Sequence, residues 1–200
     1  MKIAILNYNI GNLSSVKNAL SVLGVEANII SKSDEVAKFD KLILPGVGAF
    51  GDAIAHLNQS GMSEAIKDFV KSGKYLLGIC LGMQLLFTKS YEFGEFEGLN
   101  LIKGEVVKFE SEFLKIPQMG WNRIEIMRDC ALLSGIENGA FLYFVHSFYV
   151  PQNSACVATC DYGERFSAIV QKDNIFGIQP HPEKSAESGL KILQNFVNLK

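Results

Sequence analysis

The first ninety residues alternate short apolar segments with longer segments of helical periodicity. The apolar segments predict four strands, over residues 2–8, 25–30, 41–44 and 75–79, with the third ending at Pro45-Gly46. The periodic segments predict helices over residues 13–24, over 52–70 with a break near Ser60-Gly61, and over 82–89. Strands that are apolar on both faces and alternate with helices indicate a parallel sheet with helices on both sides.

The pattern changes after about residue 98. Short and partly alternating apolar segments follow, which predict antiparallel strands added to the sheet over residues 101–109, 121–127, 141–145, 155–160, 166–171 and 175–178. A last amphipathic helix is expected over residues 185–199. No repeat or linker interrupts the chain, so residues 1–200 are interpreted as a single α/β domain.

The charge balance and the apolar segments exclude several classes of protein. A net charge of −2 provides no basic surface for nucleic acid. No apolar segment reaches the roughly 20 residues that cross a bilayer. The first residues also lack the features of a secretory signal. We therefore expect a cytoplasmic protein that binds neither nucleic acid nor membrane.

The four cysteines do not resemble a disulfide framework or a zinc site. No Cys-x-x-Cys pair is present, and only three histidines are available as further ligands. Cys156 and Cys160 are four residues apart in a predicted strand, where about 13 Å separates them, beyond the reach of a disulfide. Together with Cys130 they are interpreted as core residues or unreactive thiols. Neither a metal nor an organic cofactor is expected.

Gly78-Ile79-Cys80-Leu81-Gly82 is the strongest candidate for chemistry. It follows a predicted strand and precedes a predicted helix, which is the pattern of a nucleophile elbow, where a sharp turn exposes the reactive atom. The flanking glycines relieve the crowding in such a turn, and a helix N-terminus favours a thiolate. The pattern alone leaves open a buried cysteine that happens to lie between glycines.

Gln179-Pro180-His181-Pro182-Glu183 supplies a candidate base and a residue to orient it. The two prolines favour an extended backbone, in which residues two apart project to the same side, so the Glu183 carboxylate is expected to accept a hydrogen bond from His181. The pattern alone also fits a solvated surface loop. His56 is interpreted as a surface or boundary residue, and His146 as one that lines a pocket or is satisfied within a strand.

Both motifs lie where an open α/β sheet binds ligands, at the carboxyl ends of predicted strands. The same rule nominates Asn9-Ile10-Gly11-Asn12 and the segment 45–51. Gly46-Val47-Gly48-Ala49-Phe50-Gly51 matches a dinucleotide-binding fingerprint, but it follows the third strand rather than the first, and Asp68, about twenty positions on, falls inside a predicted helix. Its backbone N–H groups are alternatively suited to stabilise an oxyanion beside Cys80.

These motifs resemble those of the class I, triad-type glutamine amidotransferases. Gly78-Ile79-Cys80-Leu81-Gly82-Met83-Gln84 resembles the nucleophile motif of that family, and His181-Pro182-Glu183 resembles its base and acid. Within the family, the chain is similar to the glutaminase subunits of imidazole glycerol phosphate synthases. The segments that carry this similarity span nearly the whole chain and occur in the expected order: residues 9–13, 45–51, 117–122, 143–149 and 182–185.

The resemblance implies a flavodoxin-like fold and hydrolysis of glutamine to glutamate and ammonia. The ammonia would pass to a (β/α)₈ cyclase subunit in histidine biosynthesis. Cys80, His181 and Glu183 would form the catalytic triad. The other implied residues form three groups: Gly46, Val47, Gly48 and Leu81 at an oxyanion hole; Gln84, His146, Ser147 and Phe148 in the glutamine pocket; and Asn12, Trp121, Tyr143 and Lys184 facing the partner.

The chain departs from the family at two positions. Pro180 stands where the family often has Phe, which removes an aromatic contact and a backbone donor, and Phe148 stands where Tyr is common, which removes a side-chain hydroxyl. Other hypotheses remain open. A stand-alone cysteine hydrolase predicts turnover without a partner, and a flavodoxin-like nucleotide-binding module predicts cofactor binding that survives loss of Cys80. A duplicated copy that supplies a different synthase would keep every motif named above.

Overall fold

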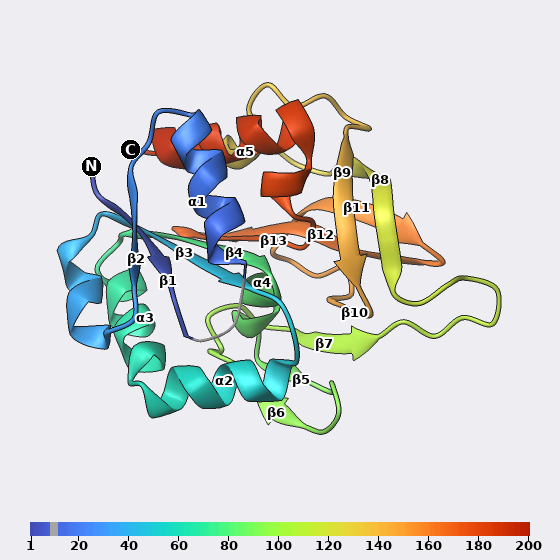
Figure 1. The fold of residues 1–200 in the computed structure, drawn as a ribbon. Helices are drawn as coiled ribbons and strands as arrows, with labels where there is room; N and C mark the ends of the chain where they lie inside the picture. Colours follow the sequence, from blue (N-terminus) through green and yellow to red (C-terminus); the bar gives the residue numbers. More distant parts are fainter. Residues whose placement is uncertain (9–11) are drawn as a thin grey trace.

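A nine-stranded sheet forms the centre of the molecule in the computed structural model, which describes residues 1–8 and 12–200 (Figure 1). Its order is β2-β1-β3-β4-β13-β12-β11-β8-β9. The first five strands in this order run parallel: β2 (Ala27–Ile30), β1 (Ile3–Leu6), β3 (Lys41–Gly46), β4 (Tyr75–Cys80) and β13 (Ile175–Ile178). With β13 as the fifth strand, this is the 2-1-3-4-5 order of a flavodoxin-like sheet, so the predicted fold class is confirmed.

Four antiparallel strands extend the sheet beyond β13. They are β12 (Glu164–Lys172), β11 (Cys156–Tyr162), β8 (Gln118–Ile126) and β9 (Phe141–His146), and β9 forms the outer edge. All four agree with the predicted segments to within a few residues. The prediction for residues 175–178 was partly wrong, because β13 is antiparallel only to β12 and runs parallel to β4.

The predicted strand over residues 101–109 also differs from the structure. Only Glu105–Lys108 form a strand, β7, and it belongs to a separate four-stranded sheet. This sheet has the order β10 (Phe148–Tyr149), β7, β5 (Lys89–Ser90) and β6 (Phe96–Glu97). Its other three strands have two residues each, which is too short for any periodicity to appear in the sequence.

Helices cover both faces of the main sheet, as predicted (Figure 1). α1 (Leu13–Val22) and α5 (Ala186–Asn198) lie on one face, and α2 (Phe50–Gln59) and α3 (Met62–Lys71) lie on the other. Alternate residues of β1 join the two cores: Ala4 and Leu6 pack on the α2–α3 side, and Ile3 and Ile5 on the α1–α5 side. The predicted break between α2 and α3 occurs at Gly61, which adopts a left-handed conformation with φ 71°.

Two predicted element ends differ from the structure. β3 continues through Pro45 and Gly46, which pair in register with Ile79 and Cys80 of β4. α4 (Leu81–Leu85) ends earlier than the predicted residue 89, because the carbonyls of residues 85–87 accept hydrogen bonds from backbone N–H groups of residues 99–102. Three unpredicted 3₁₀ helices complete the fold: η1 (Ser33–Lys38), η2 (Ala131–Leu133) and η3 (Pro182–Lys184).

The order of the sheet brings three of the four nominated segments together. β3, β4 and β13 are adjacent and parallel, so residues 45–51, Cys80 and residues 179–183 meet at one carboxyl edge. Of the fourth segment, Asn9-Ile10-Gly11 lies outside the described residues. Within residues 1–8 and 12–200, no helix is both long enough and apolar enough to cross a membrane.

Candidate functional site

Cys80 lies on a strained turn between β4 and α4. Its backbone has φ 55° and ψ −113°, a conformation that a residue with a side chain rarely adopts. The flanking glycines are required by close packing, because a Cβ on Gly78 would lie 2.6 Å from the Gly82 carbonyl oxygen, and one on Gly82 would overlap the Leu44 carbonyl oxygen. This geometry is that of a nucleophile elbow, which presents the thiol at the edge of the sheet.

His181 and Glu183 form a buried pair next to this turn. Nδ1 of His181 lies 2.8 Å from Oε1 of Glu183, and the two side chains are 3% and 2% exposed. The prediction of an extended segment holds for His181 but is wrong for the residues that follow, which form η3. The turn rather than a strand brings the carboxylate back to the ring. Ser185 fixes the turn by donating from Oγ to the His181 carbonyl oxygen at 2.6 Å.

The surroundings of His181 favour its protonated form. Burial alone lowers the pKa of the imidazole, but the nearby Cys80 thiol and the hydrogen bond to Glu183 outweigh burial and raise the pKa above its ordinary value. Among the described residues, no group forms a hydrogen bond with Nε2 of His181. This nitrogen is therefore available to exchange a proton with Cys80.

A pocket of about 200 Å³ opens beside the thiol. Most residues predicted for the oxyanion hole and for the substrate line it, and its lining consists of Val47, Gly48, Cys80, Leu81, Gln84, Glu92, Val145, His146, Ser147 and Phe148. Gly46 lies just outside this lining, where it pairs with Cys80 in the sheet and packs against Leu81. His181 and Glu183 are buried outside the lining. The structure thus gathers the predicted residues around Cys80.

His146 both lines this pocket and has its ring nitrogens satisfied, as the two interpretations from the sequence proposed. Nδ1 lies 2.8 Å from the Phe148 carbonyl oxygen, and Nε2 lies 3.0 Å from the Gln118 side-chain amide. Burial lowers the pKa of His146 to about 4. The neutral ring therefore carries its proton on Nδ1, because the Phe148 carbonyl accepts only from an N–H group, and Nε2 then accepts from the Gln118 amide, which must turn its NH₂ group toward the ring.

Two polar residues at the pocket were not assigned roles from the sequence. Glu92 lines the pocket and accepts a hydrogen bond from the Phe50 N–H at 2.7 Å, and burial raises the pKa of its carboxyl group. Gln179 lies beneath the pocket, and its Nε2 is 3.7 Å from Cys80 Sγ. The position of Gln179 immediately before Pro180 in the predicted motif was a signal that could have identified it, whereas the segment around Glu92 has no pattern.

Three of the four residues predicted to face a partner form a cluster on β8, β9 and η3, in which Trp121 and Lys184 are exposed and Tyr143 is half-buried. The rings of Trp121 and Tyr143 are 6.2 Å apart, and Lys184 Nζ lies 5.8 Å from the centre of the Tyr143 ring. Trp121 is 52% exposed. Asn12 is exposed immediately before α1, and α1 contacts η3. We call Trp121, Tyr143 and Lys184 the aromatic cluster.

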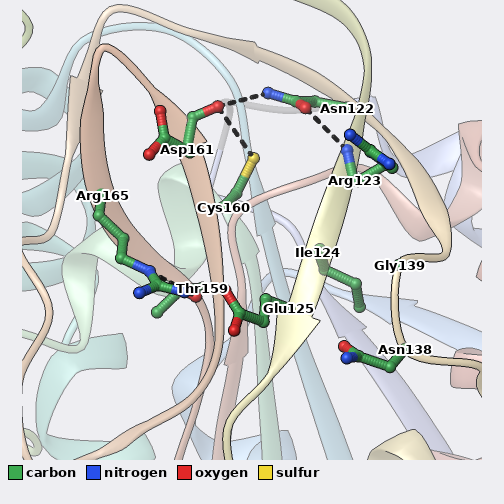
Figure 2. A pocket seen from close by; sticks show the side chains of 10 residues that line it. All are labelled: Asn122, Arg123, Ile124, Glu125, Asn138, Gly139, Thr159, Cys160, Asp161 and Arg165. Carbon is green, nitrogen blue, oxygen red and sulfur yellow. Dashed lines mark hydrogen bonds and ion pairs between the residues drawn. The ribbon is translucent and has the colours of Figure 1, made fainter.

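A second hollow, of about 550 Å³, lies between β8 and β11 and is larger than the pocket at Cys80 (Figure 2). Two pairs of its polar groups interact: Arg165 forms an ion pair with Glu125, and Nδ2 of Asn122 donates to the Asp161 carbonyl oxygen. Burial raises the pKa of the Cys160 thiol to about 12, so this sulfur stays protonated. No histidine lines the hollow. It therefore lacks an activated nucleophile.

The remaining cysteines and His56 match their predicted roles. All four cysteines are free, Cys156 and Cys160 are buried, and Cys130 is half-buried. Burial raises the pKa of the Cys130 and Cys156 thiols, which favours the unreactive protonated form. His56 is exposed on α2.

The chain is similar to known proteins over nearly its whole length. The family model for glutamine amidotransferase class-I matches residues 4–199. The chain is 53% identical to the "Imidazole glycerol phosphate synthase subunit HisH" of Wolinella succinogenes, covering 98% of this chain and 99% of that protein. It is 52% identical to the protein of the same name from Sulfurimonas denitrificans, covering 99% and 98%. The structure of PurLQS from Thermotoga maritima superposes with a TM-score of 0.79 at 21% identity, covering 98% and 97%.

Proposed function

Because the chain belongs to the class-I glutamine amidotransferase family, we propose that it is the glutaminase subunit of an imidazole glycerol phosphate synthase. In this role residues 1–200 act as one glutaminase domain that releases ammonia from glutamine. The observation that carries the proposal is the buried His181–Glu183 pair beside a cysteine on a nucleophile elbow. The proposal includes a cytoplasmic location, which rests on the biosynthetic role.

Cys80 is the nucleophile in this proposal. The Cys80 thiolate attacks the side-chain carboxamide carbon of glutamine and forms a tetrahedral intermediate. Collapse of this intermediate expels ammonia, which takes its proton from Nε2 of His181, and leaves a thioester on Cys80. A water molecule that gives a proton to His181 then hydrolyses the thioester to glutamate and restores the thiol. The hydrogen bond that His181 Nδ1 donates to the Glu183 carboxylate keeps Nε2 directed at the reaction.

The negative charge on the intermediate requires hydrogen-bond donors at the rim of the pocket. Leu81 follows the nucleophile at the start of α4, where its N–H group has no partner within the helix. Gly48 lines the same pocket with φ 101°, and Val47 precedes it. We assign the Leu81 and Gly48 N–H groups as the oxyanion donors, with the peptide between Gly46 and Val47 adjoining them. Each such donor contributes about 3–4 kcal/mol in comparable enzymes.

The remaining pocket residues orient the substrate. Glu92 is the only carboxylate among the lining residues of the pocket, and it is suited to bind the α-ammonium group of glutamine. Gln84, His146, Ser147 and Phe148 complete the wall. Phe148 still offers its backbone carbonyl, which accepts hydrogen bonds from Gln84 and His146, so the absence of a tyrosine hydroxyl leaves this scaffold in place.

The aromatic cluster supports a contact with a (β/α)₈ cyclase subunit. Exposed aromatic rings beside a cation are characteristic of protein interfaces. The cluster is joined to the catalytic pair through the backbone, because the His181 N–H group donates to the Tyr143 carbonyl oxygen at 2.9 Å. Asn12, before α1, is assigned to the same interface. A partner subunit that contacts Tyr143 would therefore be linked to His181 through a single backbone hydrogen bond.

The two alternative activities have less support. In a dinucleotide-binding fingerprint the acidic residue binds the ribose, but Asp68 lies on α3 and pairs with Lys71 at 3.6 Å. A stand-alone hydrolase would not need the aromatic cluster. The names of the two relatives refer to a subunit of a synthase, which favours a partnered enzyme. A copy that serves a different synthase would share the same site, so the experiment must include the cyclase.

The proposal is tested by measuring glutamate release from glutamine. The purified chain is assayed alone and with the cyclase subunit from the same source in the presence of its nucleotide ligand. We expect turnover that depends on the partner and is lost in Cys80→Ala. The matched control, Cys130→Ala, removes a half-buried thiol far along the chain and should retain activity. Appreciable turnover by Cys80→Ala would refute the assignment of the nucleophile.

The role of Glu183 and the pairing with the cyclase subunit are tested in the same assay. Glu183→Gln should slow turnover without abolishing glutamine binding, and an unchanged rate would remove Glu183 from the triad. Vigorous turnover by the isolated chain would favour the stand-alone hydrolase. If the chain is inactive both alone and with the cyclase, the assignment of this partner is wrong.

A further inference from the structure

We propose that Gln179 is a catalytic residue whose side-chain amide donates a hydrogen bond to the Cys80 thiolate. This inference deepens the proposed function and rests on Cys80 being the nucleophile. Gln179 follows β13 directly, and the register that pairs Ile178 with Ile79 places Gln179 next to Cys80. Its Nε2 lies 3.7 Å from Cys80 Sγ, which is within hydrogen-bond reach of a sulfur atom.

The orientation of the Gln179 amide follows from a chain of hydrogen bonds that begins at a backbone carbonyl. The Phe148 carbonyl oxygen can only accept, so Gln84 must turn its NH₂ group toward it, at 3.0 Å. The second hydrogen of the same NH₂ group points at Oε1 of Gln179, at 2.9 Å. A flipped Gln179 would set one NH₂ group against another, so its NH₂ group must face Cys80.

Burial strengthens the effect of the Gln179 N–H group on Cys80. Gln179 is 0% exposed and Gln84 is 5% exposed, so bulk water does not replace either hydrogen bond. A donor fixed beside a sulfur atom stabilises the thiolate more than the thiol, because the anion is the stronger acceptor. The Gln179 N–H group therefore favours the attacking form of Cys80. The same chain connects the thiol to Gln84 on the pocket wall.

Other groups face the same sulfur and must be held constant in any test. His181 approaches from the segment after β13, and the Tyr8 hydroxyl, which donates to the Pro45 carbonyl oxygen at 2.6 Å, approaches from the end of β1. The Val145 carbonyl oxygen lies 4.0 Å from Sγ, and Glu92 lines the pocket. None of these groups is changed by substitution at Gln179, so a changed reactivity of Cys80 reports the residue at position 179. The uncharged Gln179→Met separates loss of the amide donor from the negative charge that Glu introduces.

Two variants separate the hydrogen bond that Gln179 donates to Cys80 from the one that Gln179 accepts from Gln84. Gln179→Glu keeps an oxygen to accept from Gln84 but removes the donor to sulfur, whereas Gln179→Met removes both at similar volume. The rate of Cys80 alkylation by iodoacetamide is measured from pH 5 to pH 9 by mass spectrometry of the peptide that contains Cys80. Gln171→Glu is the matched control, because it makes the same chemical change on β12, where Gln171 Nε2 donates to the Asp173 carbonyl oxygen at 3.4 Å.

We expect Gln179→Glu to lower the alkylation rate at pH 7 by at least 10-fold and Gln179→Met by about 3- to 10-fold, with both profiles moved to higher pH. Gln171→Glu should match the parent chain. A parent-like profile for Gln179→Glu would overturn the inference, because that variant keeps the contact with Gln84. A parent-like profile for Gln179→Met beside a slower Gln179→Glu would overturn it as well, because the added charge would then account for the change. If Gln179→Glu does not fold, as judged by circular dichroism, a parent-like profile for Gln179→Met decides the question in the same way.

The outcome is distinguishable from failure of the proposed function. If Cys80→Ala abolishes glutaminase activity while both Gln179 variants alkylate normally, the nucleophile stands and the role of Gln179 is refuted. If the Gln179 variants slow alkylation but the parent chain releases no glutamate with its cyclase, the hydrogen bond stands and the glutaminase assignment fails. In the assembled enzyme, Gln179→Glu should lower kcat by at least 10-fold with little change in KM.

Discussion

Replacing His146 by Asn should flatten the dependence of folding stability on pH between pH 4 and pH 7. In the native state, burial lowers the pKa of His146 from 6.5 to about 4. The unfolded chain therefore binds a proton between these values that the folded chain excludes. By linkage, the free energy of unfolding falls as the pH falls through this window. A residue with no titrating group at position 146 removes this contribution.

The size of the effect follows from the two pKa values. With about 6.5 in the unfolded chain and about 4 in the native state, His146 destabilises the native state by about 3 kcal/mol at pH 4, about 2 kcal/mol at pH 5 and about 0.8 kcal/mol at pH 6. At pH 7.5 the contribution is about 0.1 kcal/mol. Asn retains a donor for the Phe148 carbonyl but loses the buried ring, which costs about 2–3 kcal/mol at every pH.

The measurement is urea unfolding followed by circular dichroism at four pH values from 4 to 7.5. The parent chain should be more stable than His146→Asn at pH 7.5, and the difference should shrink by about 3 kcal/mol at pH 4. Carboxyl groups and histidines that do not interact with His146 titrate in both proteins and cancel in the difference. His56→Asn, on the exposed face of α2, is the control and should follow the parent curve. A constant difference between parent and His146→Asn would contradict the burial argument.

Three further substitutions test other parts of the structure. Lys41→Met removes a buried ammonium group whose Nζ donates to the carbonyl oxygens of Phe196, Val197 and Leu199 at 2.6–2.9 Å. This variant should lower the free energy of unfolding in urea by about 3 kcal/mol. No change would mean that these carbonyls find other partners. Gly82→Ala forces a Cβ into the Leu44 carbonyl and should destabilise the chain by at least about 3 kcal/mol in the same assay, whereas a stable variant would show that the elbow can relax. Trp121→Ala should change the free energy of unfolding by less than about 0.5 kcal/mol, because Trp121 is exposed. It should weaken binding to the cyclase at least about 10-fold, measured by titration calorimetry. Unchanged affinity would place the interface elsewhere.

Much of the fold could be predicted because its strands bury both faces. Residues 3–6 are apolar without a break, and such a run between turn residues predicts a covered parallel strand. Helix periodicity likewise located α1, α2, α3 and α5, since each turns one apolar stripe toward the sheet. The positions of Cys80 and of the His181–Glu183 pair could also be predicted, because glycines and prolines around them restrict the backbone in recognisable ways.

Features that depend on long-range contacts were not predictable from local pattern. The apolar helical spacing of residues 82–89 predicted a longer helix than α4. In the structure, backbone N–H groups of residues 99–102 donate hydrogen bonds to the carbonyls at the end of α4, which ends the helix there. The strands β5, β6 and β10 have two residues each and exist through pairing with distant segments. Glu92 reaches the pocket through this second sheet, which explains why nothing in its neighbourhood indicated a role.

The orientation of β13 decides whether the candidate residues form a site at all. The sequence indicated an antiparallel strand over residues 175–178, and an antiparallel neighbour of β4 would place residue 179 at the opposite edge of the sheet. A four-residue strand spans about 13 Å, so His181 would then lie well beyond hydrogen-bond reach of Cys80. Because β13 instead runs parallel to β4, with Ile178 beside Ile79, Gln179 and His181 emerge at the carboxyl edge next to the thiol. The motifs identify the reacting groups, whereas their meeting depends on a strand direction that only the assembled sheet determines.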